Sequence, residues 1–479
     1  MSELKTAIDK MKRKGAAGPD GIPPSFIKAL GPKSLEVLLS IFNKSFAAGA
    51  LPQIWRTATI IPLLKQGKPA SDLASFRPIS LTSCLGKVLE RMIANRLYQL
   101  AEKRQWFNHQ QAGFRKGRSC VDQIIRIAQA IEDGFQQKKM HRSVLVLLDF
   151  SKAYDTVWRE RLLLSMHKKL VPLPILRWLS GFLQNRQAKV QYNDCTSTTL
   201  TMRQGLPQGS VLSPLLFLFY INNLVELLPT ENVNALFADD VGILATARTI
   251  EEAQEKAQNA VDTVVRWSKE WRLTLNATKS EATIFTTDRR RESKSTAKIF
   301  IDGKTIPFNK TPKFLGVYLD RELTFGKHVE EITKKANGKL RMLSALSHTT
   351  WGCTKRDLLK VHEAHVLSTL DYAGAGYQPW LAQSNLDALE VVQNKALRIV
   401  SGQVQNSRLS ARRKEASVPS YETRSKRLIL QSVEKAKRLP DDHPRKIALN
   451  NARRSKNDRT SWKEKACQLA HQYTPRIDY

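Results

Sequence analysis

The stretch NALFADDVGILA, from Asn234 to Ala245, places two adjacent carboxylates, Asp239 and Asp240, in the middle of an apolar run. An ionised carboxylate without a partner is costly in apolar surroundings, or its pKa shifts. The apolar arms ALFA and VGILA predict a β-hairpin with the two aspartates as its two-residue turn. Either the pair is an ordinary polar turn, or a cation binds there.

The segments around this hairpin predict a β-α-β-β-α-β unit. SVLVLLDFS (143–151) is a short apolar strand that reaches Asp149, TIEE begins a helix with a capping box at 249–252, and EATIFTT (281–287) supplies the last strand. A long insertion interrupts the first crossover. In such a sheet the first and third strands are antiparallel neighbours, so we expect Asp149 beside the aspartate pair.

Three convergent carboxylates suit a hard cation. Like charges this close cannot all stay ionised without a compensating cation. Oxygen ligands without His or Cys select Mg²⁺ or Mn²⁺, and paired ions of this kind serve in-line phosphoryl transfer. An Asp-Asp pair alone is weak evidence, because most such pairs are polar turns. Together with the aspartate that ends the first strand and the charge of the chain, it favours a polymerase.

Charge is the most informative feature of the composition. The 479 residues include 77 Lys and Arg against 44 Asp and Glu, a net charge of +33. A charge of this size indicates a polyanionic partner, with a generally basic solvated surface as the alternative. The excess of basic residues is denser towards the end of the sequence, where residues 401–479 carry 19 basic and 8 acidic side chains. This tail is predicted to be helical and to grip template RNA or target DNA through phosphates.

The remaining composition points to the interior of the cell. Five scattered cysteines support neither a zinc site nor a disulfide framework and favour a reducing compartment. No apolar run reaches the length of a membrane span, and the first residues lack a signal-peptide core. We therefore expect an intracellular protein, in the nucleus and/or the cytoplasm, that is neither secreted nor bound to a membrane.

Several motifs resemble those of one family. LLDFSKAYDTV, QGLPQGSVLSPLLF, FADD and RLTLNATKSE resemble, in order and spacing, successive motifs of reverse transcriptases. AAGPDGIP, IIPLLKQGK, FRPISLTSCLGKVLERMIANRL, QAGFRKGRSCVDQI and FLGVYLDRELTFGKHV are similar to the form found in non-long-terminal-repeat (LINE-type) retrotransposons. The resemblance spans roughly Lys14 to Gly402.

The resemblance implies an α+β fold, the right hand of a polymerase. Its expected parts are fingers at 1–142, a β-α-β-β-α-β palm at 143–325 with a fingers insertion at about 171–204, a helical thumb at 326–402 and a basic helical C-terminal extension at 403–479. In the thumb, LLKVHEAHVLSTLDYAGAGYQPW is predicted to form an amphipathic helix. Its His362 and His365 are predicted to be packing or surface residues rather than metal ligands.

The resemblance also implies catalytic residues. Asp149 and Asp239 would be the main ligands of two Mg²⁺ ions, for which Mn²⁺ is a possible substitute, and Asp240 would complete the cluster. Tyr154 matches the bulky residue whose ring would collide with a 2′-hydroxyl and so favour deoxynucleotides. A core tyrosine is the alternative for that residue.

Further residues are implied to bind the nucleotide. Gln208 matches the residue that contacts the incoming sugar, and Gly209 would let the backbone approach the nucleotide closely. Lys65 and Arg77 match a basic pair that holds the triphosphate, and Lys279 would lie near the pyrophosphate. Solvated surface lysines are the alternative for Lys279 and, taken alone, for Lys65.

The predicted function is RNA-directed DNA polymerisation, in which a primer 3′-hydroxyl is extended with deoxynucleotides on an RNA template for synthesis of element cDNA. The expected partners are the RNA template, a DNA primer or target DNA, deoxynucleotides, and a separate or missing endonuclease domain. One alternative is an inactive relic that only binds nucleic acid. Another is a different palm-type polymerase, such as an intron-maturase reverse transcriptase or an RNA-dependent RNA polymerase, although Tyr154 and FADD disfavour RNA synthesis.

Overall fold

The computed structural model describes residues 1–137, 140–288, 294–348, 350–403, 407–451, 462, 464, 468 and 469. The fold is α+β, as predicted, and the chain forms two compact units, each built from separate stretches. Unit 1 contains residues 1–114, 150–227 and 264–275. Unit 2 contains residues 115–149, 228–263 and 276–479.

Unit 1 contains the helices α1 (Ser2–Asp9), α2 (Pro24–Lys28), α3 (Pro32–Ala48), α4 (Gln53–Arg56), α5 (Cys84–Lys103), α7 (Arg159–Lys168), α8 (Leu173–Leu183) and α9 (Ser213–Leu227). Its strands are β1 (Thr57–Leu64), β2 (Phe76–Leu81), β4 (Arg186–Tyr192), β5 (Cys195–Thr196) and β6 (Leu200–Met202). Helix α10 (Ile250–Glu270) contributes to both units.

Unit 2 contains the helices α6 (Cys120–Phe135), α12 (Gly326–Ala345), α13 (Lys355–Val361), α14 (Ser368–Asp371), α15 (Gly374–Tyr377), α16 (Gln383–Ser401), α17 (Leu409–Ala416), α18 (Tyr421–Lys437) and α19 (Pro444–Asn451). Its strands are β3 (Arg142–Leu148), β7 (Val233–Phe237), β8 (Asp240–Ala247), β9 (Glu281–Phe285), β10 (Phe300–Ile301), β11 (Lys304–Thr305), β12 (Lys313–Phe314) and β13 (Val317–Tyr318).

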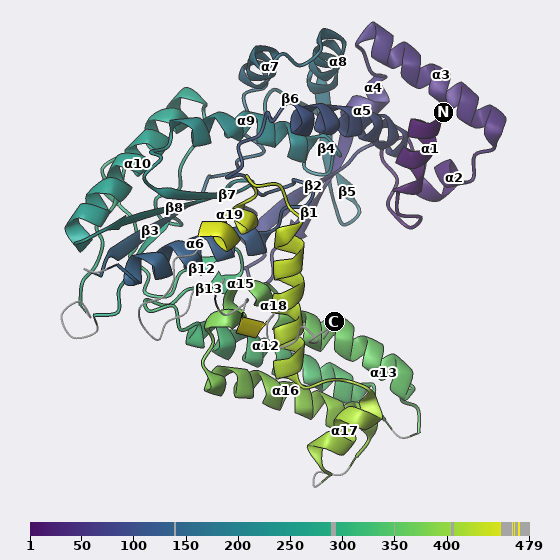
Figure 1. Cartoon of the computed structure of the whole chain (residues 1–479). Helices are drawn as coiled ribbons and strands as arrows, with labels where there is room; N and C mark the ends of the chain where they lie inside the picture. Colours follow the sequence, from purple (N-terminus) through teal and green to yellow (C-terminus); the bar gives the residue numbers. More distant parts are fainter. Residues whose placement is uncertain are drawn as a thin grey trace, which may run out of the picture. The chain divides into compact units, whose positions relative to one another are not determined.

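The main sheet of unit 2 has the strand order β7-β8-β3-β9. Figure 1 labels β7, β8 and β3 of this sheet. Strand β3 is antiparallel to both β8 and β9, and the β7-β8 hairpin, α10 and β9 follow in the predicted order. The register places Leu148 opposite Val241. The first and third strands of the predicted unit are therefore neighbours, as the sequence indicated.

Helix α6 packs against β3, β7 and β8 of this sheet. Its buried Ile124, Ile127 and Ile131 recur at helical spacing and form one apolar face. Gln123, on the same helix, donates from Nε2 to the carbonyl oxygen of Leu236 in β7 at 3.1 Å. This bond ties the helix to the strand that leads into the aspartate turn.

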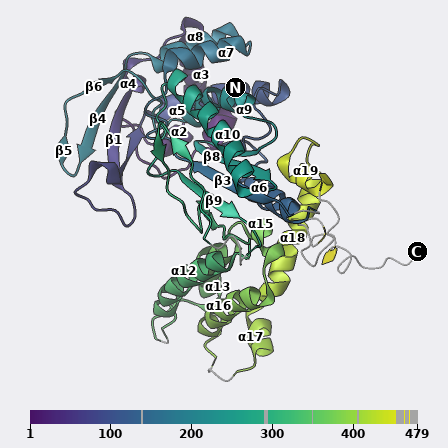
Figure 2. The ribbon, with the colours of Figure 1, turned by 90° about the vertical axis from the view of Figure 1, so that its left-hand side faces the viewer.

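The sheet of unit 1 joins segments that lie far apart in the sequence. Its order is β2-β1-β4-β5, with β6 also paired to β4. Figure 2 labels β1, β4, β5 and β6. Strand β1 runs parallel to β4, with Thr57 opposite Gln187. The β-branched residues of TATIIPLLK (57–65) predict a strand, and this segment forms β1. The sequence from 76 to 102 predicts a loop that leads into a helix, but its first residues form β2 instead. Strand β2 is an edge strand, where Pro78 leaves no ladder hydrogen bond unmade.

The helices after α12 differ from the prediction in one place. The segment expected as a single amphipathic helix is divided into α13, a π-helical turn at His362–Leu367, α14 and α15. Ala373 has a φ of 55°, which ends α14, and the following glycines and Pro379 prevent a continuous helix. His362 is buried and His365 is exposed, so one occupies a packing position and the other a surface position.

Within the ranges given above, no helix is both long enough and apolar enough to span a membrane.

Candidate active site

Asp149 directly follows β3 and is held by a turn that precedes β9. The backbone N–H of Asn276 donates to the Asp149 carbonyl oxygen at 2.8 Å, and the Asp149 N–H donates to Ser280 Oγ at 3.1 Å. Ser280 Oγ in turn donates to the Asn276 carbonyl oxygen at 2.8 Å. Two residues of the NATKS motif therefore fix the backbone of the aspartate at the end of the central strand.

The aspartate hairpin turns one residue earlier than predicted. Phe237 pairs with Asp240, the first residue of β8, so the two-residue turn is Ala238–Asp239 and not Asp239–Asp240. Ala238 is buried and has a φ of 58°, a conformation that costs an alanine roughly 1–2 kcal/mol. Aspartate is the more frequent turn residue, which is why the sequence favoured the other register. Asp239 consequently lies in the turn while Asp240 opens the strand.

The three aspartates lie close together. Because Leu148 is opposite Val241, the antiparallel register places Asp149 beside Asp240. Partial removal of the Asp240 carboxyl from water, and then the charges of Asp239 and Asp149, raise its pKa to about 6. The residue as a whole is exposed, so solvent screens part of this repulsion. The predicted convergence of 149 with 239 and 240 is observed.

The donor set of this cluster is chemically suited to a divalent cation. All its ligand atoms are carboxylate oxygens, and the repulsion that raises the pKa of Asp240 is what a hard cation would relieve. Across the part of the chain that the structure describes, no three Asp, Glu, His or Cys side chains form a ready-made metal-binding group. By ligand type and charge, the three aspartates suit a divalent metal ion.

In unit 1, Tyr154 lies beside the loop that carries the GLPQGS motif. Its ring stacks on Phe217 of α9 with centroids 4.5 Å apart and planes 17° apart. The Tyr154 carbonyl oxygen accepts the N–H of Leu206 at 2.7 Å. The ring is therefore held on one face, and its backbone is tied to the loop.

The GLPQGS loop also contacts β2. The Ser80 N–H donates to the carbonyl oxygen of Gln208 at 2.7 Å, and a Cβ on Gly209 would lie 2.4 Å from the Ser80 carbonyl oxygen. Gly209 is exposed and has a φ of 126°, so only glycine fits there without a shift of the backbone. Gln208 is half-buried, and its Nε2 donates to Asp155 Oδ1 at 3.0 Å.

Two buried charged residues that the sequence analysis missed hold this loop. Glu90 of α5, only 3% exposed, accepts hydrogen bonds at Oε2 from Ser210 Oγ, Val211 N and Leu212 N, at 2.5, 2.8 and 3.3 Å. Arg159 donates to the carbonyl oxygens of Gly205, Gln204, Met202 and Leu183. A glutamate among the apolar positions of CLGKVLERMIANRL was the one available signal, since its partners lie in a distant segment.

The predicted basic residues form two groups. Lys65 and Arg77 are exposed on the β1-β2 hairpin, where Arg77 is opposite Leu63 and the Lys65 N–H donates to the Ser75 carbonyl oxygen at 2.9 Å. Lys65 Nζ also donates to the Ala74 carbonyl oxygen at 2.9 Å. Lys279 is exposed in the turn whose Ser280 binds Asp149. The first two belong to unit 1 and Lys279 belongs to unit 2.

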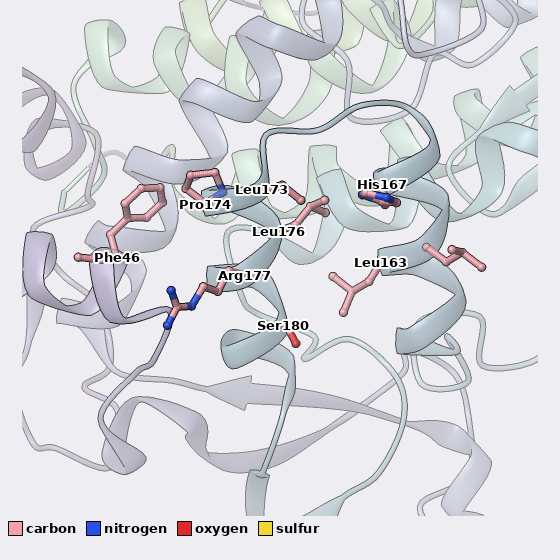
Figure 3. A pocket seen from close by; sticks show the side chains of 10 residues that line it. Phe46, Leu163, His167, Leu173, Pro174, Leu176, Arg177 and Ser180 are labelled. Atoms are coloured by element: carbon pink, nitrogen blue, oxygen red, sulfur yellow. The ribbon is translucent and has the colours of Figure 1, made fainter.

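A hollow of about 840 Å³ lies elsewhere in unit 1, between α3, α7 and α8 (Figure 3). Its walls are mostly apolar, with Phe46, Leu163 and Leu176 facing it beside Arg177 and His167. None of the predicted site residues lines this hollow.

A family comparison covers the segments that carry the predicted site. Residues 64–319, more than half of the chain, match the family model described as reverse transcriptase (RNA-dependent DNA polymerase). The chain belongs to the reverse transcriptase family. All nine predicted site residues, from Lys65 to Lys279, fall inside the matched range.

Two relatives of this reverse transcriptase are proteins of mobile elements in Drosophila melanogaster. It is 32% identical over 409 residues to the probable RNA-directed DNA polymerase from transposon BS. This alignment covers 84% of this chain and 44% of the relative. It is 28% identical over 457 residues to the RNA-directed DNA polymerase from mobile element jockey. That alignment covers 93% of this chain and 49% of the relative. The predicted resemblance to LINE-type reverse transcriptases is confirmed. The chain spans less than half the length of each of these two relatives.

Proposed function

We propose that this reverse transcriptase extends a primer 3′-hydroxyl with deoxynucleotides on an RNA template, as the polymerase part of a non-long-terminal-repeat retrotransposon protein. The observation that carries the proposal is the convergence of Asp149, Asp239 and Asp240 at one end of the β7-β8-β3-β9 sheet. The names of the relatives, RNA-directed DNA polymerases, support the same activity.

In this proposal the aspartates bind two Mg²⁺ ions, or Mn²⁺ in their place. When bound, such ions supply charge that activates the attacking hydroxyl and stabilises the departing pyrophosphate. The protein contributes position: the turn around Asn276 and Ser280 fixes Asp149, and the β7-β8 pairing fixes the other two. Catalysis is then mainly alignment and neutralisation of charge.

The remaining site residues select and hold the nucleotide. Tyr154 blocks a 2′-hydroxyl with a ring that Phe217 braces from behind. Gln208 and Gly209 receive the sugar, and the exposed Lys65 and Arg77 bind the triphosphate, with Arg77 suited to bidentate contact. Lys279, next to the residue that binds Asp149, meets the pyrophosphate.

The architecture proposed for this activity is a right hand. The fingers comprise 1–142 and the insertion at about 171–204, the palm lies within 143–325, the thumb is 326–402, and a basic extension follows at 403–479. The parallel pairing of β4 with β1 supports the insertion as part of the fingers.

The proposed partners are an RNA template, a DNA primer or target DNA, and deoxynucleotides, which the chain meets inside the cell, in the nucleus and/or the cytoplasm. An endonuclease, where nicking is needed, would come from another part of a longer protein or from another chain. The net charge of +33 supports binding to nucleic-acid backbones, which would weaken steeply as salt is raised.

The test is primer extension on an RNA template with Mg²⁺ and deoxynucleotides. We expect extension by the parent and none by Asp239→Asn/Asp240→Asn, with unchanged affinity for the template. Asp302→Asn is the matched control, because Asp302 occupies the turn of a different hairpin, β10-β11. Salt-sensitive RNA binding without extension by the parent would instead support an inactive nucleic-acid-binding relic.

A further inference from the structure

We propose that Asp155 is a positioning residue that fixes the carboxamide of Gln208 with its nitrogen towards Asp155 and its oxygen towards the bound nucleotide. The inference rests on the proposed function, because it concerns how the same site reads the sugar. Asp155 would contact no substrate itself and would act through Gln208.

Hydrogen bonds fix the backbone of the GLPQGS loop at its start, middle and end. Glu90 holds its end through the backbone N–H groups of Val211 and Leu212, and Arg159 holds its start through the carbonyl oxygens of Gln204 and Gly205. The Ser80 N–H holds the middle at Gln208. What remains to be set is the orientation of the Gln208 side chain.

The hydrogen bond between the side chains of Gln208 and Asp155 determines how the amide is turned. Gln208 Nε2 lies 3.0 Å from Asp155 Oδ1. An ionised carboxylate only accepts hydrogen bonds, whereas a carboxamide has a donating nitrogen and an accepting oxygen. The amide must therefore turn its nitrogen to Asp155, which leaves its oxygen on the opposite side.

Asp155 is half-buried and packs closely against the loop that carries Gln208. It follows Tyr154, and a Cβ on Gly205 would lie 2.4 Å from the Asp155 carbonyl oxygen, so the aspartate backbone and the loop are in close contact. Burial raises the pKa of the Asp155 carboxyl, while the bond from Gln208 and the charge of Lys152 oppose that rise. A half-buried carboxylate in this position is stabilised by the amide that it orients.

The consequence is specificity for one feature of the sugar. A carboxamide oxygen accepts a hydrogen bond and so favours a group that donates one, such as the 3′-hydroxyl of a deoxynucleotide. A dideoxynucleotide lacks that donor and would leave the oxygen unpaired. Asp155 would thus set the preference for deoxynucleotides over dideoxynucleotides.

The experiment compares kcat/KM for a deoxynucleotide with that for the matching dideoxynucleotide. We expect Asp155→Leu to lower the ratio by about tenfold, the size of a charge-assisted hydrogen bond. Asp155→Asn, whose amide bonds Gln208 in either orientation, should give an intermediate value and guards against misfolding of the leucine variant. Asp194→Asn, an exposed aspartate in the turn between β4 and β5, is the control and should behave as the parent.

A double-mutant cycle separates positioning from a structural role. If Asp155 acts through Gln208, then Asp155→Asn adds nothing to Gln208→Ala in the double variant. Equal losses with both nucleotides, or losses that add in the double variant, would overturn the proposal. Thermal unfolding of each variant identifies any loss due to folding.

Equilibrium binding of both nucleotides is measured beside extension. A parent that binds nucleotides but extends no primer contradicts the proposed function, and the binding ratios of the variants then decide the role of Asp155. A parent that binds no nucleotide overturns both.

Discussion

Gly209 shows how one absent side chain fixes the loop beside β2. A Cβ there would meet the Ser80 carbonyl oxygen at 2.4 Å, and the backbone φ of 126° is strained for any other residue. We expect Gly209→Ala to displace the loop and to lower kcat/KM for deoxynucleotides by roughly tenfold or more, because misplacement in a site by about 1 Å is costly. Steady-state extension kinetics on an RNA template measure the loss.

The matched control is Gly31→Ala, also in unit 1. Gly31 has a φ of −76° with no atom within 4 Å of a built Cβ, so alanine should be tolerated. Wild-type kinetics of the Gly209 variant would show that the loop yields without cost.

For single residues, the sequence was sufficient where the residue type is unusual for its surroundings. The three aspartates stood out as charges in apolar strands, and their convergence is observed. Glu90, Arg159 and Asp155 were missed, because each binds a segment remote in the sequence and nothing in its own surroundings names that segment. The register of the turn at Ala238 was missed because a buried alanine with positive φ breaks the usual preference.

Among the elements, α6 and α19 are joined by a buried ion pair. Arg445 Nε donates to Asp122 Oδ1 at 2.7 Å, with 6% and 0% of the two side chains exposed. We expect Arg445→Met to lower the free energy of unfolding by roughly 3–5 kcal/mol, since it leaves a buried carboxylate without its cation. Urea denaturation monitored by circular dichroism measures the change.

Two further variants interpret that result. Asp122→Asn combined with Arg445→Met removes the charge left behind and should recover part of the loss. Lys437→Met breaks the exposed pair with Glu434 and should change stability little. If the Arg445 variant is as stable as the Lys437 variant, the contact between α6 and α19 contributes no net stability.

Element by element, apolar periodicity predicted the sheet of unit 2 because every strand in it is bounded by clear turn signals. It failed at β2, where a proline at a sheet edge imitates a loop, and between α13 and α15, where glycines and a π-helical turn divide a helical pattern. The pairing of β1 with β4 was not predictable, because the strand pattern of a segment does not specify a partner 130 residues away.

For the molecule as a whole, acid should weaken unit 2. Burial, and after it the charge of nearby cations, lowers the pKa of both His328 and His362 from 6.5 to about 4. Well above pH 6.5 both histidines are neutral in the folded and in the unfolded chain. As the pH falls towards about 4, the unfolded chain takes up protons that the folded chain refuses, so up to about 3 kcal/mol per histidine is lost.

Urea unfolding between pH 7 and pH 4.5 tests this linkage. We expect the free energy of unfolding to decrease as the pH is lowered in the parent, and to decrease less in His362→Leu, which lacks one of the two histidines. Leucine should be tolerated, because neither ring nitrogen of His362 has a hydrogen-bond partner among the described residues. The matched variant His365→Gln alters an exposed side chain, which meets water in both states, and should follow the parent. Identical slopes in all three proteins would contradict the linkage.

The two partners of the ion pair between α6 and α19 are translated at different times. Asp122 and Arg445 are 323 residues apart, so a ribosome that adds roughly 5–20 residues per second completes the second partner about 15–65 s after the first. Throughout that interval the nascent α6 holds a carboxylate whose cation has not yet been translated. The helix that packs on the aspartate hairpin therefore reaches its final packing only after most of the polypeptide has been synthesised.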